Sequence, residues 1–240
     1  MDSFKGKIAV VTGGGTGMGR ELCLQLVKEG CNVATCDVLM ENLEETKALC
    51  QEVNPDIQVT LHECDVSSEE AMNHFRDEVT AAHGGKINLL FNNAGIGGGG
   101  SFVNPDDRAD WERTFNVCWY GVYYGCRAFM ESLINADESH IVNTSSINGF
   151  WASLGPNTPH SAYCSAKFAV KGFSEALVTD LRMNAPHVGV SVVMPGHIGT
   201  SIAINSGRVL GRPAALDMSE DDIKDIRERM MNSGGEMSEV

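Results

Sequence analysis

The sequence has no hydrophobic run long enough to cross a membrane, and it is poor in positive charge. No segment approaches the roughly 20 apolar residues that a membrane-spanning helix needs, so a membrane partner is not expected. Its 18 Lys and Arg residues stand against 32 Asp and Glu residues, which gives a net charge of −14 at pH 7. A nucleic-acid partner is not expected either, because binding to phosphates requires a basic face.

Paired cysteine and histidine motifs are missing as well. The eight cysteines include no CxxC pair, and the seven histidines include no HExxH spacing. We therefore expect neither a disulfide framework nor a metal site. The first residues also lack the long apolar core of a secretory signal. These absences predict a cytoplasmic protein with reduced thiols.

Glycine, by contrast, is concentrated near the start of the chain. Residues 8–11 form an apolar, β-branched run typical of a buried strand, and residues 20–29 have the pattern of an amphipathic helix. Five glycines lie between Gly13 and Gly19. A strand, a glycine turn and a helix in this order form a phosphate cradle, because the backbone comes close to the ligand and the helix N-terminus offers free N–H groups. The pattern therefore favours nucleotide binding over a merely flexible turn.

Acidic residues follow two later strand patterns. Asp37 ends the strand predicted over residues 32–36, and it lies 18 positions after Gly19. This spacing is typical of the carboxylate that binds the adenosine ribose and repels a 2′-phosphate, so the sequence predicts NAD rather than NADP. Asp65 and Val66 follow the strand predicted over residues 57–63. Asp65 either accepts a hydrogen bond from the adenine or belongs to the entry of the next helix.

Strand and helix patterns alternate along the rest of the chain. Further strands are predicted over residues 87–91, 139–144 and 188–193, and helices over 41–53, 67–83, 107–133 and 161–183. Right-handed crossovers then give a doubly wound α/β fold of the Rossmann type, a parallel sheet with helices on both faces. No composition shift divides the chain, so we predict a single domain over residues 1–240.

Tyr163 and Lys167 are four positions apart on a predicted helix, so they share one face. An ammonium group beside a phenol is expected to lower the phenol's pKa from about 10, which makes Tyr163 a candidate acid and base. Ser146 follows another strand and offers a hydroxyl that could bind a substrate oxygen at the same place. The alternative is a chance pair on a solvated helix face.

These features together resemble the short-chain dehydrogenase/reductase family over residues 5–200. The matching motifs are TGGGTGMG (12–19), Asp37, Asp65-Val66, NNAG (92–95), Asn116, Ser146, YCSAK (163–167) and PGHIGT (195–200). The resemblance implies a hydride transfer between NAD and a secondary alcohol or ketone. It also implies a catalytic tetrad, in which Tyr163 moves the hydroxyl proton, Lys167 holds the nicotinamide ribose, Ser146 fixes the substrate oxygen and Asn116 holds a water molecule.

The resemblance further implies a set of cofactor contacts. These are Gly13, Thr16, Gly17, Met18, Gly19, Asp37, Asp65, Val66, Asn92, Ala94, Gly95, Tyr163, Lys167, Pro195, Gly196, Ile198 and Thr200. Ile198 and Thr200 would meet the carboxamide and a nearby phosphate. From the residues alone, Asn92 and Asn93 either brace neighbouring strands or touch the cofactor.

The substrate pocket and the C-terminal part are predicted more coarsely. Pocket candidates are Phe102, Ile147, Trp151, Met194 and His197, which suggest an apolar small-molecule substrate. A substrate lid is expected at about residues 197–233, and a helix over 219–231. The family's terminal strand is not visible, which favours an incomplete chain, and the family usually forms homodimers or homotetramers. Alternatives to the dehydrogenase are an epimerase or dehydratase that retains NAD, and a non-catalytic dinucleotide sensor.

Overall fold

A six-stranded parallel sheet forms the centre of the computed structural model, which describes residues 1–152, 159–196, 198, 200, 202–212, 222 and 225. The strands are β1 Ile8–Thr12, β2 Asn32–Asp37, β3 Val59–Glu63, β4 Leu89–Asn92, β5 Ser139–Thr144 and β6 Val188–Val193. They are ordered β3-β2-β1-β4-β5-β6, and all neighbouring strands pair in parallel. The predicted doubly wound sheet is therefore confirmed.

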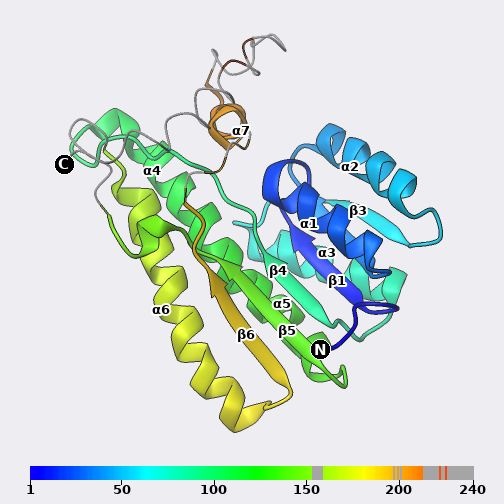
Figure 1. The fold of residues 1–240 in the computed structure, drawn as a ribbon. Helices are drawn as coiled ribbons and strands as arrows, with labels where there is room; N and C mark the ends of the chain where they lie inside the picture. The colour runs from blue at the N-terminus through cyan, green and yellow to red at the C-terminus, as the bar shows by residue number, and fades with distance from the viewer. Residues whose placement is uncertain are drawn as a thin grey trace.

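Helices cover both faces of this sheet (Figure 1). Helices α1 Gly17–Lys28 and α2 Met40–Val53 pack on one face, and α3 Glu69–His83, α5 Gly121–Ile134 and α6 Ser161–Asn184 pack on the other. The shorter helices are α4 Arg108–Phe115 and α7 Ile202–Val209. Among the described residues, no helix has both the length and the apolar character needed to cross a membrane. The predicted helix over 219–231 lies outside the described residues except for positions 222 and 225.

Each central strand sends alternate side chains into two separate cores. On β1, Val10 packs against α3 and α5, whereas Ala9 and Val11 pack against α1. These residues are fully buried, as are Leu90 on β4 and Ile141 on β5. Burying one such aliphatic side chain stabilises the fold by about 1.5–3 kcal/mol, so continuous apolar strands form here because both of their faces are covered.

The sheet brings distant segments together at its carboxyl edge. Strand order reverses between β1 and β4, which lie side by side although β2, β3 and their helices separate them in the chain. The turn at Gly13, the loop at Asn93 and the loop at Ser145 all leave the sheet at this edge. In open α/β sheets, ligands bind in the crevice outside the strand ends at such a reversal.

Candidate active site

One cleft at the carboxyl edge, with a volume of about 310 Å³, gathers nearly all of the predicted site. It is lined by every predicted cofactor residue except Asn92: Gly13, Thr16, Gly17, Met18, Gly19, Asp37, Asp65, Val66, Ala94, Gly95, Tyr163, Lys167, Pro195, Gly196, Ile198 and Thr200. Ser146 lines the same cleft. The structure thus joins the glycine turn and the Tyr-Lys pair, which are about 150 residues apart in the chain, in one site.

The glycine turn is closely packed and needs its glycines. Gly13 and Gly17 have φ angles of 69° and 55°, which favour glycine. A Cβ atom on Gly19 would lie 2.0 Å from the carbonyl oxygen of Gly13, and one on Gly13 would lie 2.8 Å from the Cα atom of Ala94. The backbone at the start of α1 can therefore approach a ligand as closely as the predicted cradle requires.

The N-terminus of α1 is suited to an anion. Its N-cap residue, Thr16, makes no side-chain capping bond, and the first turn contains no acidic residue. The first N–H groups of a helix have no partner within the helix, and its dipole favours negative charge there. This uncapped end fits the pyrophosphate of a dinucleotide, as the sequence predicts.

Asp37 stands at the end of β2, next to the turn. One of its carboxylate oxygens accepts a hydrogen bond from the backbone N–H of Gly15 at 3.1 Å, and the other accepts from Leu39 at 3.2 Å. Burial raises the pKa of this carboxyl group, and the hydrogen bonds from backbone N–H groups oppose that change. The carboxylate therefore has a fixed position in the cleft, next to the glycine turn.

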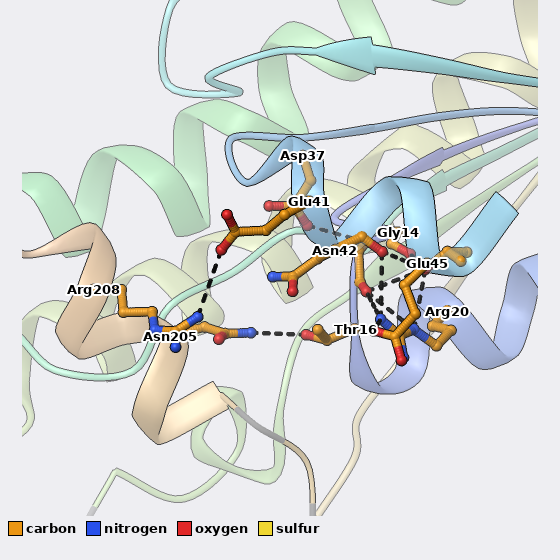
Figure 2. Close-up of polar contacts among 11 residues, drawn as sticks. Gly14, Thr16, Arg20, Asp37, Glu41, Asn42, Glu45, Asn205 and Arg208 are labelled. Carbon is orange, nitrogen blue, oxygen red and sulfur yellow. Dashed lines mark hydrogen bonds and ion pairs between the residues drawn. The ribbon is translucent and has the colours of Figure 1, made fainter. Parts of the chain in front are cut away.

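The positively charged side chain of Arg20 bonds to the glycine turn from outside the cleft. Its guanidinium group donates to the carbonyl oxygen of Gly15 at 2.6 Å and pairs with Glu45 at 2.6 Å. Figure 2 shows Arg20 on α1 beside Glu45 on α2, with Asn42 between this pair and Asp37. Arg20 does not line the cleft, so its charge supports the turn instead of standing beside Asp37.

Helix α7 lies over the same turn (Figure 2). The amide nitrogen of Asn205 donates to the hydroxyl of Thr16 at 2.8 Å, and Arg208 lies 3.7 Å from a carboxylate oxygen of Glu41 on α2. Asn205 lines the cleft together with Thr16. The part of the predicted lid that the structure describes thus contacts the glycine turn and α2.

Asp65 has partners for both of its oxygens. One oxygen pairs with Arg113 at 2.7 Å, and the other accepts from the backbone and hydroxyl of Ser67 at 3.0 and 2.7 Å. Although burial raises the pKa of Asp65, the bonds from Arg113 and Ser67 outweigh it, and the pKa is lowered overall. Asp65 is therefore ionised at neutral pH, and it lines the cleft from within this network.

Asn92 and Asn93 have different surroundings. Asn92 is buried, and its amide donates to the side chain of Asn143 on β5 at 2.8 Å. Asn93 lines the cleft and donates to the carbonyl oxygens of Thr12 and Gly13 at 3.0 and 3.3 Å. The sequence predicts that Asn92 either braces neighbouring strands or touches the cofactor. In the structure Asn92 links β4 to β5 and does not line the cleft.

The Tyr-Lys pair lies on the buried side of α6. Lys167 is only 2% exposed, and its Nζ atom donates to the carbonyl oxygen of Thr144 at 2.8 Å and lies 5.5 Å from the Tyr163 ring centroid. A hydrogen bond to the side chain of Ser146 favours the ionised form of Tyr163. The structure therefore brings Ser146, Tyr163 and Lys167 together, as predicted.

The predicted fall in the pKa of Tyr163 is not what the structure gives. Burial raises the pKa of Tyr163 to about 12, with a smaller contribution in the same direction from Cys118, and only the bond to Ser146 opposes this. Burial also lowers the pKa of Lys167. The reason is that burial removes water from both groups and disfavours the charged form of each.

The fourth predicted residue, Asn116, does not reach this group. Asn116 begins a π-helical turn, Asn116–Tyr120, and is absent from the cleft lining. Cys118, fully buried, takes the inner position: a Cβ atom on Gly95 would lie 3.5 Å from Nζ of Lys167 and 3.7 Å from Sγ of Cys118. Residues two apart on a helix point to nearly opposite sides, so Asn116 and Cys118 cannot both face Lys167.

The predicted substrate pocket is only partly found. Ile147 lines the cleft, but Trp151 and Met194 do not, and Trp151 is 65% exposed. Phe102 is exposed and contacts the ring of Trp111 instead. His197 lies outside the described residues.

Two polar residues that the sequence reasoning missed, Asn148 and His160, line the cleft near Tyr163. The spacing of His160, three positions before Tyr163, was the signal that could have revealed it.

Metal ligands do not gather in this part of the molecule. In the part of the chain that the structure describes, no group of three or more His, Cys, Asp or Glu side chains is placed to hold an ion. The chemically active groups that do line the cleft include the phenol of Tyr163, the hydroxyl of Ser146 and the ammonium group of Lys167.

Known proteins share this arrangement. Residues 7–209 match the family described as short chain dehydrogenase. The chain belongs to this family. It is 40% identical over 206 residues to SadH of Mycobacterium tuberculosis, whose name classes it with the oxidoreductases, and the match covers 86% of this chain and 72% of that protein.

Solved structures of the family differ in the nucleotide that they carry. A short-chain dehydrogenase/reductase from Burkholderia phymatum in complex with NAD has 32% identity and a TM-score of 0.79, covering 98% of this chain and 82% of its own. A metagenomic short-chain oxidoreductase in complex with NADP has 31% identity and a TM-score of 0.70, covering 82% and 85%.

Proposed function

We propose that the protein is an NAD-dependent oxidoreductase that transfers a hydride between the nicotinamide and a secondary alcohol or ketone. The observation that carries this proposal is the single cleft that holds an uncapped helix N-terminus and Asp37 at one end and Ser146, Tyr163 and Lys167 at the other. Family membership supports the general reaction. The bound nicotinamide would supply the hydride donor or acceptor.

The chain's own residues supply binding and proton transfer. The N–H groups at the start of α1 hold the pyrophosphate, and Lys167, with its ammonium group fixed by Thr144, holds the nicotinamide ribose. Ser146 binds the substrate oxygen, and Tyr163 donates a proton to it during ketone reduction. The raised pKa of Tyr163 suits this direction, since the phenol then carries its proton at neutral pH.

Asp37 supports NAD over NADP. Its carboxylate is fixed by two backbone N–H groups at the place where the adenosine ribose binds in this fold. A 2′-phosphate beside this carboxylate would be repelled, and the nearby cation Arg20 is engaged with Gly15 and Glu45. The NADP-bound relative makes a direct measurement of cofactor preference necessary.

The proposal also covers the domain organisation, the oligomeric state and the location of the enzyme. We propose one domain with a lid at about residues 197–233, a homodimer or homotetramer, and a place in the cytoplasm. Contacts of α7 with the cleft support the lid, because the hydroxyl of Ser206 accepts from the backbone N–H of Gly97 at 2.7 Å. Light scattering of the purified protein tests the oligomer.

The Tyr163→Phe variant tests the proposed reaction. Loss of the phenolic proton donor is expected to lower kcat by about 10²–10⁴-fold and to leave NAD binding nearly unchanged. The readout is the absorbance of reduced nicotinamide with a panel of secondary alcohols and ketones, and calorimetry for NAD. Turnover that survives in Tyr163→Phe contradicts the assignment. Tightly held NAD with no net reduction would favour an epimerase or dehydratase, and binding without any reaction would favour a sensor.

A further inference from the structure

His160 lies directly against the ring of Tyr163. It is the N-cap residue of α6, three positions before Tyr163, and the two ring centroids are 4.7 Å apart with an angle of 32° between the planes. Both residues line the cleft. The imidazole is therefore placed at the substrate end of the site, beside the phenol.

The ring nitrogens of His160 are available to a ligand. Its side chain makes no capping bond to α6. The polar side-chain atoms that the structure shows as buried without a partner, among the residues it describes, are Oδ1 of Asn92 and Oγ1 of Thr114. The nitrogens of His160 are therefore not sealed inside the protein, and the residue itself lines the cleft.

A second polar group stands on the same wall. Asn148 follows Ser146 by two positions and is 8% exposed. Its backbone N–H donates to the hydroxyl of Ser146 at 3.2 Å, and its amide donates to the carbonyl oxygen of Trp151 at 3.1 Å. Its side-chain oxygen is not among the enclosed, unpartnered atoms in the described part of the protein. The wall around Ser146 and Tyr163 is thus more polar than an apolar substrate needs.

We propose that His160 is a specificity residue that binds a second oxygen of the substrate, carried on the carbon next to the reacting one. This inference rests on the proposed function and names its substrate class: vicinal diols, α-hydroxyketones or α-diketones. In such a substrate the second oxygen lies on the carbon next to the reacting one, and a hydrogen bond of about 2.8 Å would join it to the imidazole that lies against the Tyr163 ring. A substrate of this class can thus bond to Tyr163 and His160 at once.

A neutral imidazole at His160 is suited to an uncharged substrate oxygen, such as a hydroxyl or a carbonyl. Burial lowers the pKa of His160 from its ordinary value, so the ring is neutral at pH 7 and has one donor and one acceptor nitrogen. A hydroxyl can use either nitrogen, and a carbonyl can use the donor. A carboxylate would instead favour a charged imidazolium.

The first experiment compares matched substrates. Cyclohexane-1,2-diol and cyclohexanol differ by one hydroxyl, and kcat/KM is measured for each with NAD. The wild-type protein is expected to prefer the diol by about tenfold, the contribution of one net hydrogen bond. His160→Phe keeps an aromatic ring against Tyr163 but removes both nitrogens, so the preference should fall to near one, mainly through a higher KM for the diol. His160→Gln should recover part of it.

The control is His74→Phe, since the side chain of His74 is 72% exposed and lies on α3. This variant should keep the full diol preference. A wild-type ratio near one, or a ratio that His160→Phe does not change, would overturn the proposal.

A second measurement does not depend on turnover. Ligand-observed NMR with the protein and NAD compares binding of 2-hydroxycyclohexanone and cyclohexanone to wild type and His160→Phe. Preferential binding of the hydroxyketone that is lost in His160→Phe supports the proposal, even where no hydride transfer occurs and the proposed function fails. Equal binding, or no binding of either compound, contradicts it.

Discussion

The thiol of Cys118 lies beside the ammonium group of Lys167, and both border Gly95 at the base of the cleft. The thiol also donates to the carbonyl oxygen of Ile96 at 3.2 Å, which ties the π-helical turn to the loop after β4. An ionised thiol at this point would raise the pKa values of both Tyr163 and Lys167. Cys118, and not Asn116, is therefore the residue of this turn that shares the position next to Gly95 with Lys167.

The first prediction separates Cys118 from Asn116. Cys118→Ala leaves the buried carbonyl of Ile96 without its donor, which costs about 1–3 kcal/mol, and it loosens the wall beside Lys167. We expect kcat/KM to fall by about tenfold, and Cys118→Ser, which keeps a donor, to retain most of the activity. Asn116→Ala should stay within about twofold of wild type, because Asn116 does not line the cleft.

Steady-state kinetics and urea unfolding of these three variants check this prediction. A loss in Asn116→Ala as large as that in Cys118→Ala would restore Asn116 to the catalytic group and show that the π-helical turn is misplaced.

The presence of Cys118 where Asn116 was expected shows a limit of what the sequence could predict. The strands, their alternation with helices and the meeting of Ser146, Tyr163 and Lys167 follow from apolar runs and from i, i+4 spacing, and the structure agrees. A π-helical turn closes with i→i+5 bonds, and no hydrophobic pattern announces where it starts. The sequence therefore predicts Asn116 through the resemblance to the family, whereas the turn places Cys118 next to Lys167. His160 is not among the predicted site residues, because it precedes the predicted helix. It lies three positions before Tyr163, and both residues line the cleft.

The second prediction concerns the direction of the reaction and pH. Because burial raises the pKa of Tyr163 to about 12, the phenol is protonated between pH 6 and 9. Ketone reduction, which needs the protonated phenol, should vary little over this range. Alcohol oxidation needs the ionised form, and its kcat should rise with pH by up to about tenfold per unit. Rates measured in both directions in the same buffers test this, and an oxidation rate already constant from pH 6 upward would contradict it.

The third prediction concerns cofactor choice at Asp37. Asp37→Asn removes the charge that repels a 2′-phosphate and weakens the bonds to the ribose hydroxyls, each charged bond being worth about 1.5–3 kcal/mol. We expect the preference for NAD over NADP, measured as the ratio of kcat/KM values, to fall by roughly 10–100-fold.

Asp65→Asn is the matched control, because Asp65 lies in the same cleft but bonds to Arg113 and Ser67. This variant should change kcat/KM for the two nucleotides by a similar factor. If Asp37→Asn leaves the ratio as it is, Asp37 does not select the nucleotide.

The fourth prediction concerns the polar chain that holds α6 against the sheet. Asn143 accepts from the amide of Asn92 at 2.8 Å and donates to the hydroxyl of Ser174 at 2.9 Å, and this hydroxyl donates to the carbonyl oxygen of Val170 at 2.7 Å. All three side chains are buried. Asn143→Ala leaves the amide of Asn92 with only its bond to Sγ of Cys126 at 3.3 Å and removes the donor to Ser174. We expect a loss of about 2–3 kcal/mol in the free energy of unfolding.

The same substitution should also lower kcat, since α6 carries both Tyr163 and Lys167. Asn73→Ala is the matched control: Asn73 accepts from Arg76 on α3 at 3.1 Å, near the surface, and its change should stay within about 0.5 kcal/mol. Urea unfolding of both variants gives the comparison. Equal stabilities would mean that apolar packing alone seats α6 on the sheet, and the catalytic pair would then owe its position to contacts other than this chain.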